Sequence, residues 1–402
     1  MHQGPKISLK YLFFTFLKIG SVSWGGFMAL IAVVEKQLVE KDKIIQHEMI
    51  LDGISLASVL PGPVAFNVVT YVGYRLRGLK GALVSMAAIL LPSFLLILML
   101  ATGYTKYSEL PVFSRFFLGV LPAITAVVLS VAITMIQKQV KDYKQIIICV
   151  LAGITLIVLH AFYATIFVIF ISGLIGYLLY HVSDKKPVIR NKTNNSVDYK
   201  RIAFIVSIFL LLLLGTGLLA LFLTPSDKHE YKILQTIFLT FSGMSVTLFG
   251  GGYVIIPAMQ QIIVDGLHWL TINEFSDAIA MGQITPGPIL ISATFIGFHL
   301  AGFWGACVAT VAIFLPPGII MIIFSGLLEK IKVSNAINSI FKGMRPAIIG
   351  MIISAAFSIG KGAAYQWPSA VIFLTVFILL VKFKFNVVYL IPLAGIVGVI
   401  LL

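Results

Sequence analysis

Charged residues are scarce in this chain of 402 residues: they make up 11% of it, and only 15 residues are acidic. Hydrophobic residues account for 59%. No soluble domain of this length hides so many apolar side chains, so the composition excludes an ordinary soluble protein. The net charge of +14 comes from lysines and arginines spread over short segments between apolar runs. That distribution is typical of loops that set membrane topology and not of a nucleic-acid-binding surface.

Cysteine is nearly absent, and the motifs of common active sites are missing. Cys149 and Cys307 lie singly in apolar runs, which predicts neither a disulfide nor a metal cluster. The sequence has no phosphate-binding P-loop, no His-Glu-x-x-His motif, no Cys-x-x-Cys motif and no nucleophile elbow. We therefore expect no enzyme, no metal and no cofactor.

Apolar runs of about 20 residues, the length that crosses the hydrocarbon core of a bilayer, recur along the whole chain. They predict an all-α, polytopic protein of the cell membrane with about thirteen transmembrane helices. The candidate spans are 8–34, 50–74, 79–103, 113–137, 144–159, 161–180, 201–223, 234–263, 275–298, 303–328, 336–360, 364–381 and 386–402. The fifth, the sixth and the last two are short, and the sequence leaves open whether they span fully.

Two Pro-Gly-Pro triplets, Pro61-Gly62-Pro63 and Pro286-Gly287-Pro288, interrupt apolar runs. Proline lacks a backbone N–H and pushes the preceding residue out of the α region, so no regular helix continues through either triplet. Proline suits the first helical position, which predicts a break and then a new helix that begins at Pro63 and at Pro288. The first N–H groups of such a helix are unpaired and carry a partial positive charge, which is the outline of an anion site.

The two triplets belong to a long internal repeat. Residues of the first half match residues of the second half at one constant offset, and after a deletion of one residue the register continues. The matched pairs include Phe16 and Phe241, Asp52 and Asp277, Pro61 and Pro286, Gly78 and Gly302, Pro92 and Pro316, and Pro122 and Pro346. Such a register predicts two homologous repeats with broken helices.

The polar segment 182–200 is a linker that separates the first repeat, 1–181, from the second, 234–402. One extra apolar helix within 201–233 makes the number of intervening spans odd, so the second repeat enters the membrane with inverted topology. Most lysines and arginines then share the side of the N-terminus, which the positive-inside rule makes cytoplasmic. Lys36, Lys41 and Lys43 disagree, because a straight span over 8–34 carries them to the other side.

Glycine pairs, Gly25-Gly26 and Gly250-Gly251, interrupt the first helix of each repeat. Close helix packing would explain them, since small residues let two backbones approach. Adjacent glycines cost about 1 kcal/mol each within a helix, which favours a second pair of broken helices that line the same site as the triplets.

Polar side chains beside the triplets are candidate ligands of an anion. The amides of Asn67 and Gln283 offer N–H donors, and Ser58 and Thr285 offer hydroxyls. The alternative for each is an ordinary hydrogen bond between helices.

Ionisable residues add candidates of a different kind. Asp52 and Asp277 precede their triplets at equivalent positions, where they either cap a helix at the interface or exchange protons within the membrane. Lys18 and Arg345 are long-range cation candidates that either draw an anion inward or extend to the membrane interface.

Together these motifs resemble the chromate ion transporter family in its long, two-domain form. The resemblance rests on the segment from Phe16 to Gly26, on both triplets, on the Leu-Pro pairs at Pro92 and Pro316, and on Gly-x-x-Pro-Ala at Gly119 and Gly343, and it covers most of both repeats. Ser58 stands where the family pattern has a glutamine. The resemblance implies a proton-driven antiporter that exports chromate, with sulfate as a competing analogue.

We therefore expect oxyanion efflux across the plasma membrane, with a substrate site made of both glycine pairs, both triplets, Asn67 and Gln283. The expected partners are a small inorganic anion and the lipid bilayer, with no nucleic acid. An anion channel, a structural membrane protein, and another small anion such as sulfate remain as alternatives, and a homodimer is left open.

Overall fold

The computed structural model describes residues 7–23, 27–58, 60–107, 110–158, 164–180, 229–247, 255–325, 335–362 and 367–402. These residues form helices and no strand, which confirms the all-α class. The first half contains α1 (Leu9–Val22), α2 (Phe27–Glu35), the π-helix η1 (Lys36–Lys41), α3 (His47–Ala57), α4 (Val64–Tyr107), α5 (Pro111–Gln139), α6 (Tyr143–Val158) and α7 (Ala164–Tyr180). The second half contains α9 (His229–Thr247), α10 (Ile255–Met259), the π-helix η3 (Gln260–Gly266), α11 (Ile272–Ile284), the 3₁₀ turn η4 (Ile289–Ile291), α12 (Ser292–Phe324), α14 (Asn335–Gly362), α15 (Trp367–Val381) and α16 (Val387–Leu401).

Four helical segments in the described part of the chain are long and apolar enough to cross a membrane: Val64–Tyr107, Arg115–Gln137, Ile289–Phe324 and Ser339–Lys361. The helices α6, α7, α15 and α16 are apolar but shorter. Large side chains such as Phe170 and Trp367 are exposed on the outer surface, as lipid-facing residues are. The expected span 201–223 lies outside the described residues.

Both α4 and α12 reverse direction at a glycine. Gly78 has φ +61° and Gly302 has φ +57°, a backbone region that favours glycine. Beyond each turn the helix folds back, because Gly73 packs against the backbone of Gly81 and no Cβ fits between them. The second repeat builds the same turn. The two arms of α4 therefore form one helical hairpin, and the two arms of α12 form another.

The chain also reverses at each Pro-Gly-Pro triplet. A Cβ added to Gly53 in α3 would lie 3.0 Å from the ring of Tyr71 in α4, and Nε2 of His299 in α12 lies 3.7 Å from Oε1 of Glu274 in α11. Residues 18 positions apart on one straight helix would be about 27 Å apart. The predicted breaks are therefore confirmed. The segments 50–74 and 275–298 are nevertheless hairpins with a triplet at the tip and not single spans. Proline chemistry determines where a helix ends but not the direction that the chain takes afterwards.

The first helices of the chain form a further hairpin. The hydroxyl of Tyr11, near the start of α1, donates a hydrogen bond to Asp42, which follows η1. This contact makes α1 antiparallel to the segment formed by α2 and η1. Both ends of the segment over 8–41 consequently lie on one side, so the prediction of one straight span over 8–34 is wrong.

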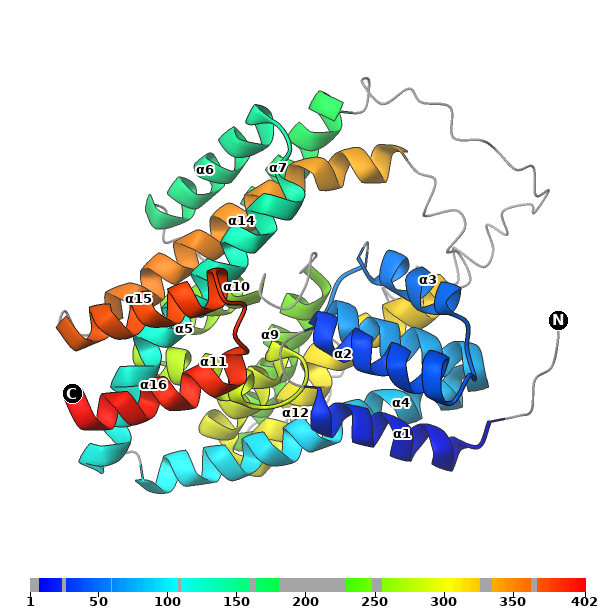
Figure 1. Cartoon of the computed structure of the whole chain (residues 1–402), viewed down its shortest axis with the longest axis horizontal. Coiled ribbons are helices and arrows are strands. Elements are labelled where there is room, and N and C mark those ends of the chain that lie inside the picture. Colours follow the sequence, from blue (N-terminus) through cyan, green and yellow to red (C-terminus); the bar gives the residue numbers. More distant parts are fainter. Residues whose placement is uncertain are drawn as a thin grey trace.

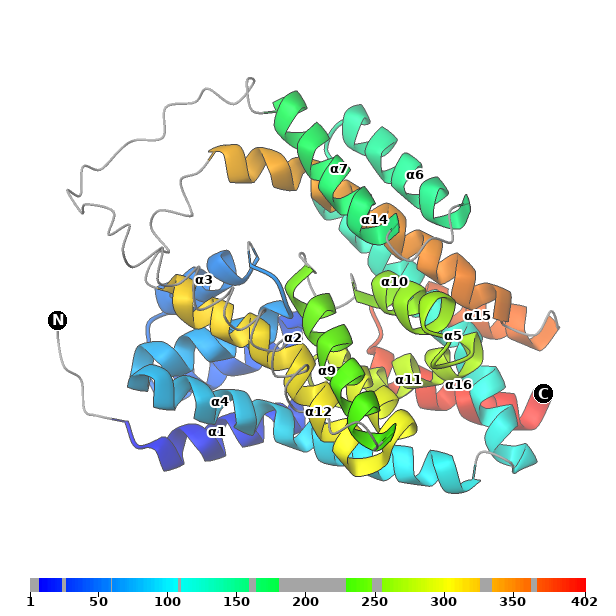
Figure 2. The ribbon, with the colours of Figure 1, turned by 180° about the vertical axis from the view of Figure 1, so that it is seen from behind.

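The two halves interlock through their short helices. Figures 1 and 2 show α6 and α7 of the first half alongside α14, and α15 and α16 of the second half alongside α5. Glycines make both contacts close: Gly343 of α14 packs on Gly176 of α7, and Gly119 of α5 packs on Gly398 of α16. Since Gly119 and Gly343 are matched repeat positions, each half contributes the same kind of contact to the other. The start of α1 and the end of α16 lie at opposite ends of the molecule (Figure 1).

Candidate functional site

Each triplet forms the tip of a hairpin and fixes a new helix start. Gly62 has φ +97° and Gly287 has φ +108°, so the two tips turn in the same unusual conformation. Pro63 directly precedes α4, and Pro288 is the N-cap of η4 with φ −76° and ψ 137°. The new helices therefore begin one residue later than predicted.

Both tips dock on the other half of the molecule. A Cβ on Gly62 would overlap the ring of Pro317 in α12, and a Cβ on Gly287 would lie 2.7 Å from Oγ of Ser93 in α4. Ser93 and Pro317 are matched positions, because each follows the proline of a Leu-Pro pair. Ser93 also donates a hydrogen bond from its hydroxyl to the carbonyl of Pro286. The tips are thus held by a reciprocal pair of contacts.

The end of α1 adjoins the second tip. The N–H of Gly287 donates to the carbonyl of Ser23 at 3.1 Å, and Ser23 is buried. Ser23 stands two residues before Gly25 in the sequence. Four predicted site residues, Gly25, Gly26, Gly250 and Gly251, lie outside the described residues.

Three of the four predicted polar donors already have partners. Nδ2 of Asn67, which is fully buried, donates to the carbonyl of Pro61 at 2.9 Å and braces the first tip, while Oδ1 of Asn67 has no partner in the described structure. The hydroxyl of Ser58 donates to the carbonyl of Ser55, and that of Thr285 donates to the carbonyl of Gly282. These two hydroxyls hold helix ends, and Asn67 keeps one amide hydrogen for another acceptor.

Gln283 differs from the other candidates because its whole carboxamide is unused. Its side chain, in the last turn of α11, is 8% exposed, and neither Nε2 nor Oε1 has a hydrogen-bond partner among the described residues. The hydroxyl of Ser292, on the other arm of the same hairpin, is also buried and has no hydrogen-bond partner in the described part of the chain. Leaving a buried polar group unpaired costs about 1–3 kcal/mol, so this arrangement indicates a place that a polar ligand or water fills.

The two matched aspartates have different surroundings. Asp277 is 8% exposed, and its Oδ2 accepts a hydrogen bond of 3.0 Å from the hydroxyl of Tyr104, a residue of the first half. Asp52 is half-buried. The capping role that the sequence left open for Asp277 is taken by Glu274, which forms a capping box with Thr271 at the start of α11.

The two cation candidates lie on the surface. Lys18 of α1 is exposed, and so is Arg345 of α14, whose guanidinium lies 5.7 Å from the ring centroid of Phe341. Neither is among the residues that contact the tips. Within the described ranges no group of histidines, cysteines and carboxylates is placed to hold a metal ion.

Sequence reasoning missed Ser93, Pro317 and Tyr104. The Leu-Pro pairs before Ser93 and Pro317 were a signal, because a repeated proline inside a helix marks a special position. Tyr104 had no signal, since its bond to Asp277 joins residues that are 173 positions apart.

Comparisons with known proteins agree with the repeats and with the motifs. The family model described as "Chromate transporter" matches residues 10–177 and 235–399. A protein of Synechococcus elongatus named "Probable chromate transport protein" is 30% identical over 373 residues, which cover 92% of this chain and 90% of that protein. The "Chromate transport protein" of Cupriavidus metallidurans is 28% identical over 386 residues, which cover 96% of this chain and 90% of the relative.

A shorter relative matches less than half of this chain. The "Uncharacterized transporter YwrA" of Bacillus subtilis is 26% identical over 166 residues, which make up 93% of its own length and 40% of this chain. No solved structure matches the chain. The family model covers most of both halves, and the chain therefore belongs to the chromate transporter family.

Proposed function

We propose that the protein is a transporter that exports a tetrahedral oxyanion, chromate with sulfate as an analogue, and binds it between the two Pro-Gly-Pro tips. The observation that carries this proposal is the buried carboxamide of Gln283 beside the second tip, which has no hydrogen-bond partner within the described ranges. The names of the relatives from Synechococcus elongatus and Cupriavidus metallidurans support chromate as the substrate.

A dianion that enters a membrane protein loses hydration worth far more than one hydrogen bond returns, so several donors must converge on it. Two new helices begin at the tips, and their first N–H groups have no partner within the helix. The first bond within α4 runs from the N–H of Asn67 to the carbonyl of Pro63, which leaves the amides of residues 64–66 for the ligand. The donor set consists of these amides, the amides of Ile289 and Leu290 after Pro288, Gln283 and the second amide hydrogen of Asn67; the N–H of Ile291 is excluded because it donates to the carbonyl of Pro288.

Chromate and sulfate have the same charge and shape, so a site made of such donors accepts both. Binding through neutral donors also favours release, because a lysine or arginine clamp would hold a dianion more tightly. Lys18 and Arg345 act at a distance in this proposal. Their exposure on α1 and α14 supports that role.

Proton coupling is assigned to the aspartates, chiefly to Asp277. A carboxyl group that titrates inside a membrane is a means of exchanging a proton for a substrate. The bond from Tyr104 to Asp277 joins the long helix of the first half to the hairpin of the second, so a change of protonation there acts on both halves. Asp52 holds the matched position in the first half and is the second candidate.

The hairpins support an inverted arrangement of the repeats at 1–181 and 234–402. The arms α1, α3 and α11 have 14, 11 and 13 residues, which correspond to about 16–21 Å, roughly half of a bilayer core. Hairpins that enter from opposite sides therefore meet at the midplane. The reciprocal docking of Gly62 on Pro317 and of Gly287 near Ser93 fits a pseudo-two-fold axis between the halves.

The hairpins also change which lysines and arginines lie on the cytoplasmic side of the membrane. With the N-terminus in the cytoplasm, the linker 182–200 inside and the helix of 201–233 crossing outward, Lys36, Lys41 and Lys43 return to the cytoplasmic side. Outside the helix interiors, the basic residues left on the outer side are Lys106, Arg115, Lys228, Lys232 and Lys361. This follows the positive-inside rule better than straight spans do.

Uptake of labelled chromate and sulfate into vesicles of both orientations, with and without a proton gradient, tests the proposal. We expect saturable uptake of both anions that depends on the gradient, and an apparent KM that is about tenfold higher in Gln283→Ala. The control is Gln46→Ala, which changes an exposed glutamine at the start of α3. A current that does not saturate would replace the transporter by an anion channel, and the absence of any anion flux would replace it by a structural role.

A further inference from the structure

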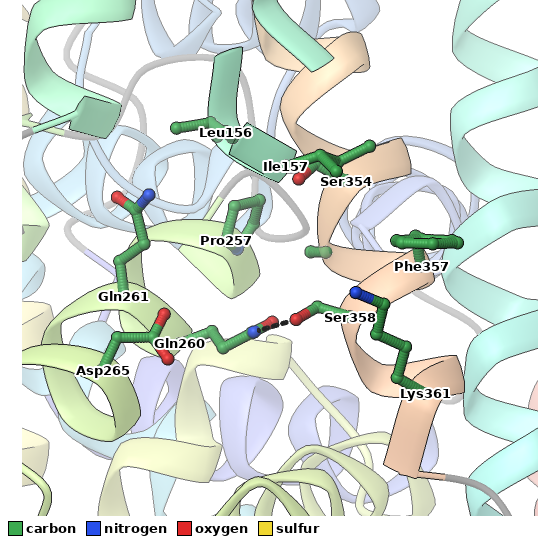
Figure 3. Close-up of a pocket in the computed structure, with 11 residues that line it drawn as sticks. Leu156, Ile157, Pro257, Gln260, Gln261, Asp265, Ser354, Phe357, Ser358 and Lys361 are labelled. Atoms are coloured by element: carbon green, nitrogen blue, oxygen red, sulfur yellow. Dashed lines mark hydrogen bonds between the residues drawn. The ribbon is translucent and has the colours of Figure 1, made fainter. Parts of the chain in front are cut away.

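A polar cavity that contains no residue of the tips lies between η3, α14 and α6 (Figure 3). Its polar lining consists of Gln260, Gln261 and Asp265 from η3 and of Ser354, Ser358 and Lys361 from α14. The spacing of the three α14 residues puts them on one face of that helix. The helix α6 contributes only Leu156 and Ile157.

Gln260 is the polar group at the centre of this cavity. It is 6% exposed, and its Nε2 donates to the hydroxyl of Ser358 at 2.6 Å. Its Oε1 is buried without a hydrogen-bond partner among the described residues. A buried acceptor of this kind is costly when it stays unpaired, so it indicates an occupant that donates a hydrogen bond.

The charged groups of the cavity restrict that occupant further. Figure 3 shows the carboxylate of Asp265 and the amine of Lys361 on opposite sides of the bond between Gln260 and Ser358. Lys361, in the last turn of α14 with its Nζ 4.8 Å from the ring centroid of Phe357, calls for a negative ligand. The carboxylate of Asp265 repels an anion unless the anion donates a hydrogen bond to it.

We propose that this cavity binds a protonated tetrahedral oxyanion, such as hydrogen chromate or hydrogen phosphate. Its charged oxygens face Lys361, and its O–H donates to Oε1 of Gln260 or to Asp265. Sulfate carries no proton near neutral pH, so it can face Lys361 but cannot donate a hydrogen bond to Oε1 of Gln260. This inference rests on the proposed function and deepens it, because the donors at the tips do not distinguish chromate from sulfate.

The size of the cavity suits such a ligand. About 30 Å³ of it is open to the centre of a water-sized oxygen, and one such oxygen needs about 10–15 Å³. Two or three oxygens of the anion fit inside, and the remainder faces the open side of the cavity.

The first repeat does not reproduce the chemistry of this cavity. At the matched positions Gln137 replaces Lys361 and Glu35 replaces Gln260. Glu35 already has a partner, because its Oε1 lies 2.5 Å from Nδ1 of His47. The site therefore belongs to the second half alone, on the outer side of the membrane in the proposed topology.

Calorimetric titration of the purified full-length protein with inorganic phosphate and with sulfate tests the cavity without relying on transport. We expect phosphate to bind the wild type, Lys361→Met and Gln260→Leu to weaken that binding about tenfold or more, and Lys361→Arg to retain it. The charge control is Lys382→Met, at an exposed site beyond α15, and thermal unfolding shows whether each variant is folded. Absence of phosphate binding in the wild type, or wild-type binding in both cavity variants, would overturn the inference.

Transport selectivity gives a second test, because a residue with a purely structural role would not change the ratio of chromate to sulfate transport. In Gln260→Leu the ratio of chromate to sulfate kcat/KM should fall about tenfold near pH 6.5 and less at pH 8, where a smaller share of chromate is protonated. Equal losses of kcat/KM for both anions would show that Gln260 serves packing and not selectivity. A wild type that transports neither anion would contradict the proposed function and leave the phosphate titration to decide the cavity.

Discussion

Replacing Gly287 by alanine should destabilise the second tip for two separable reasons. One is backbone strain, because φ is +108° at this residue. The other is crowding, because the new Cβ would lie 2.7 Å from Oγ of Ser93. Gly302→Ala is the matched control, since Gly302 has φ +57° but nothing within 4 Å of an added Cβ.

The magnitudes follow from these two contacts. Strain at a positive φ costs about 1–3 kcal/mol, and crowding in a packed region costs about 1–3 kcal/mol more. Ser93→Ala alone should cost about 0.5–1.5 kcal/mol, because it removes the hydrogen bond to the carbonyl of Pro286. In the Ser93→Ala background the crowding disappears, so Gly287→Ala should then cost about 1–3 kcal/mol less.

A double-mutant cycle on the free energy of unfolding, measured in detergent, isolates this term. We expect a coupling of about 1–3 kcal/mol between Gly287 and Ser93, and additivity within about 0.5 kcal/mol between Gly302 and Ser93. Additive effects in the first pair would refute the docking of the second tip on α4.

Three further changes probe the charged groups. Asp277→Asn should abolish the response of transport to a proton gradient while exchange of labelled anion continues, and Asp52→Asn should reduce it less; equal effects would contradict the special role given to the buried carboxyl. The hydrogen bond from the Tyr11 hydroxyl lowers the pKa of Asp42 and so stabilises the fold above about pH 4, an effect that is lost as the pH falls through the lowered pKa. Tyr11→Phe should remove this pH-dependent stabilisation. A difference in unfolding free energy from the wild type that does not change with pH would argue against this account. Lys18→Ala should change the KM for sulfate less than about threefold, because an exposed charge acts weakly; a larger rise would place Lys18 in the binding site.

The sequence was sufficient to predict helices, the repeat and the breaks at both triplets, because hydropathy, register and proline chemistry are local properties. It did not predict that the chain turns back after Pro63, since either direction satisfies the same proline rules. The contact between Gly53 and Tyr71 shows that the chain turns back, and that contact exists only in the folded molecule.

The polar candidates show the same limit. The sequence did not distinguish Asn67, Ser58 and Gln283 as donors. The structure gives partners to Asn67 and Ser58, whereas Gln283 has none among the described residues. The partner of Asp277 comes from Tyr104 in the other half, and no spacing rule relates two residues so far apart.

Equilibrium binding of labelled sulfate to purified protein tests the central claim most directly. If the carboxamide of Gln283 donates to the anion, Gln283→Ala should weaken binding about tenfold, which corresponds to about 1.4 kcal/mol, while Lys18→Ala and Gln46→Ala should bind as the wild type does. Unchanged binding in Gln283→Ala together with lost binding in Lys18→Ala would contradict a site built from neutral donors at the tips and would replace it by one held by a fixed charge.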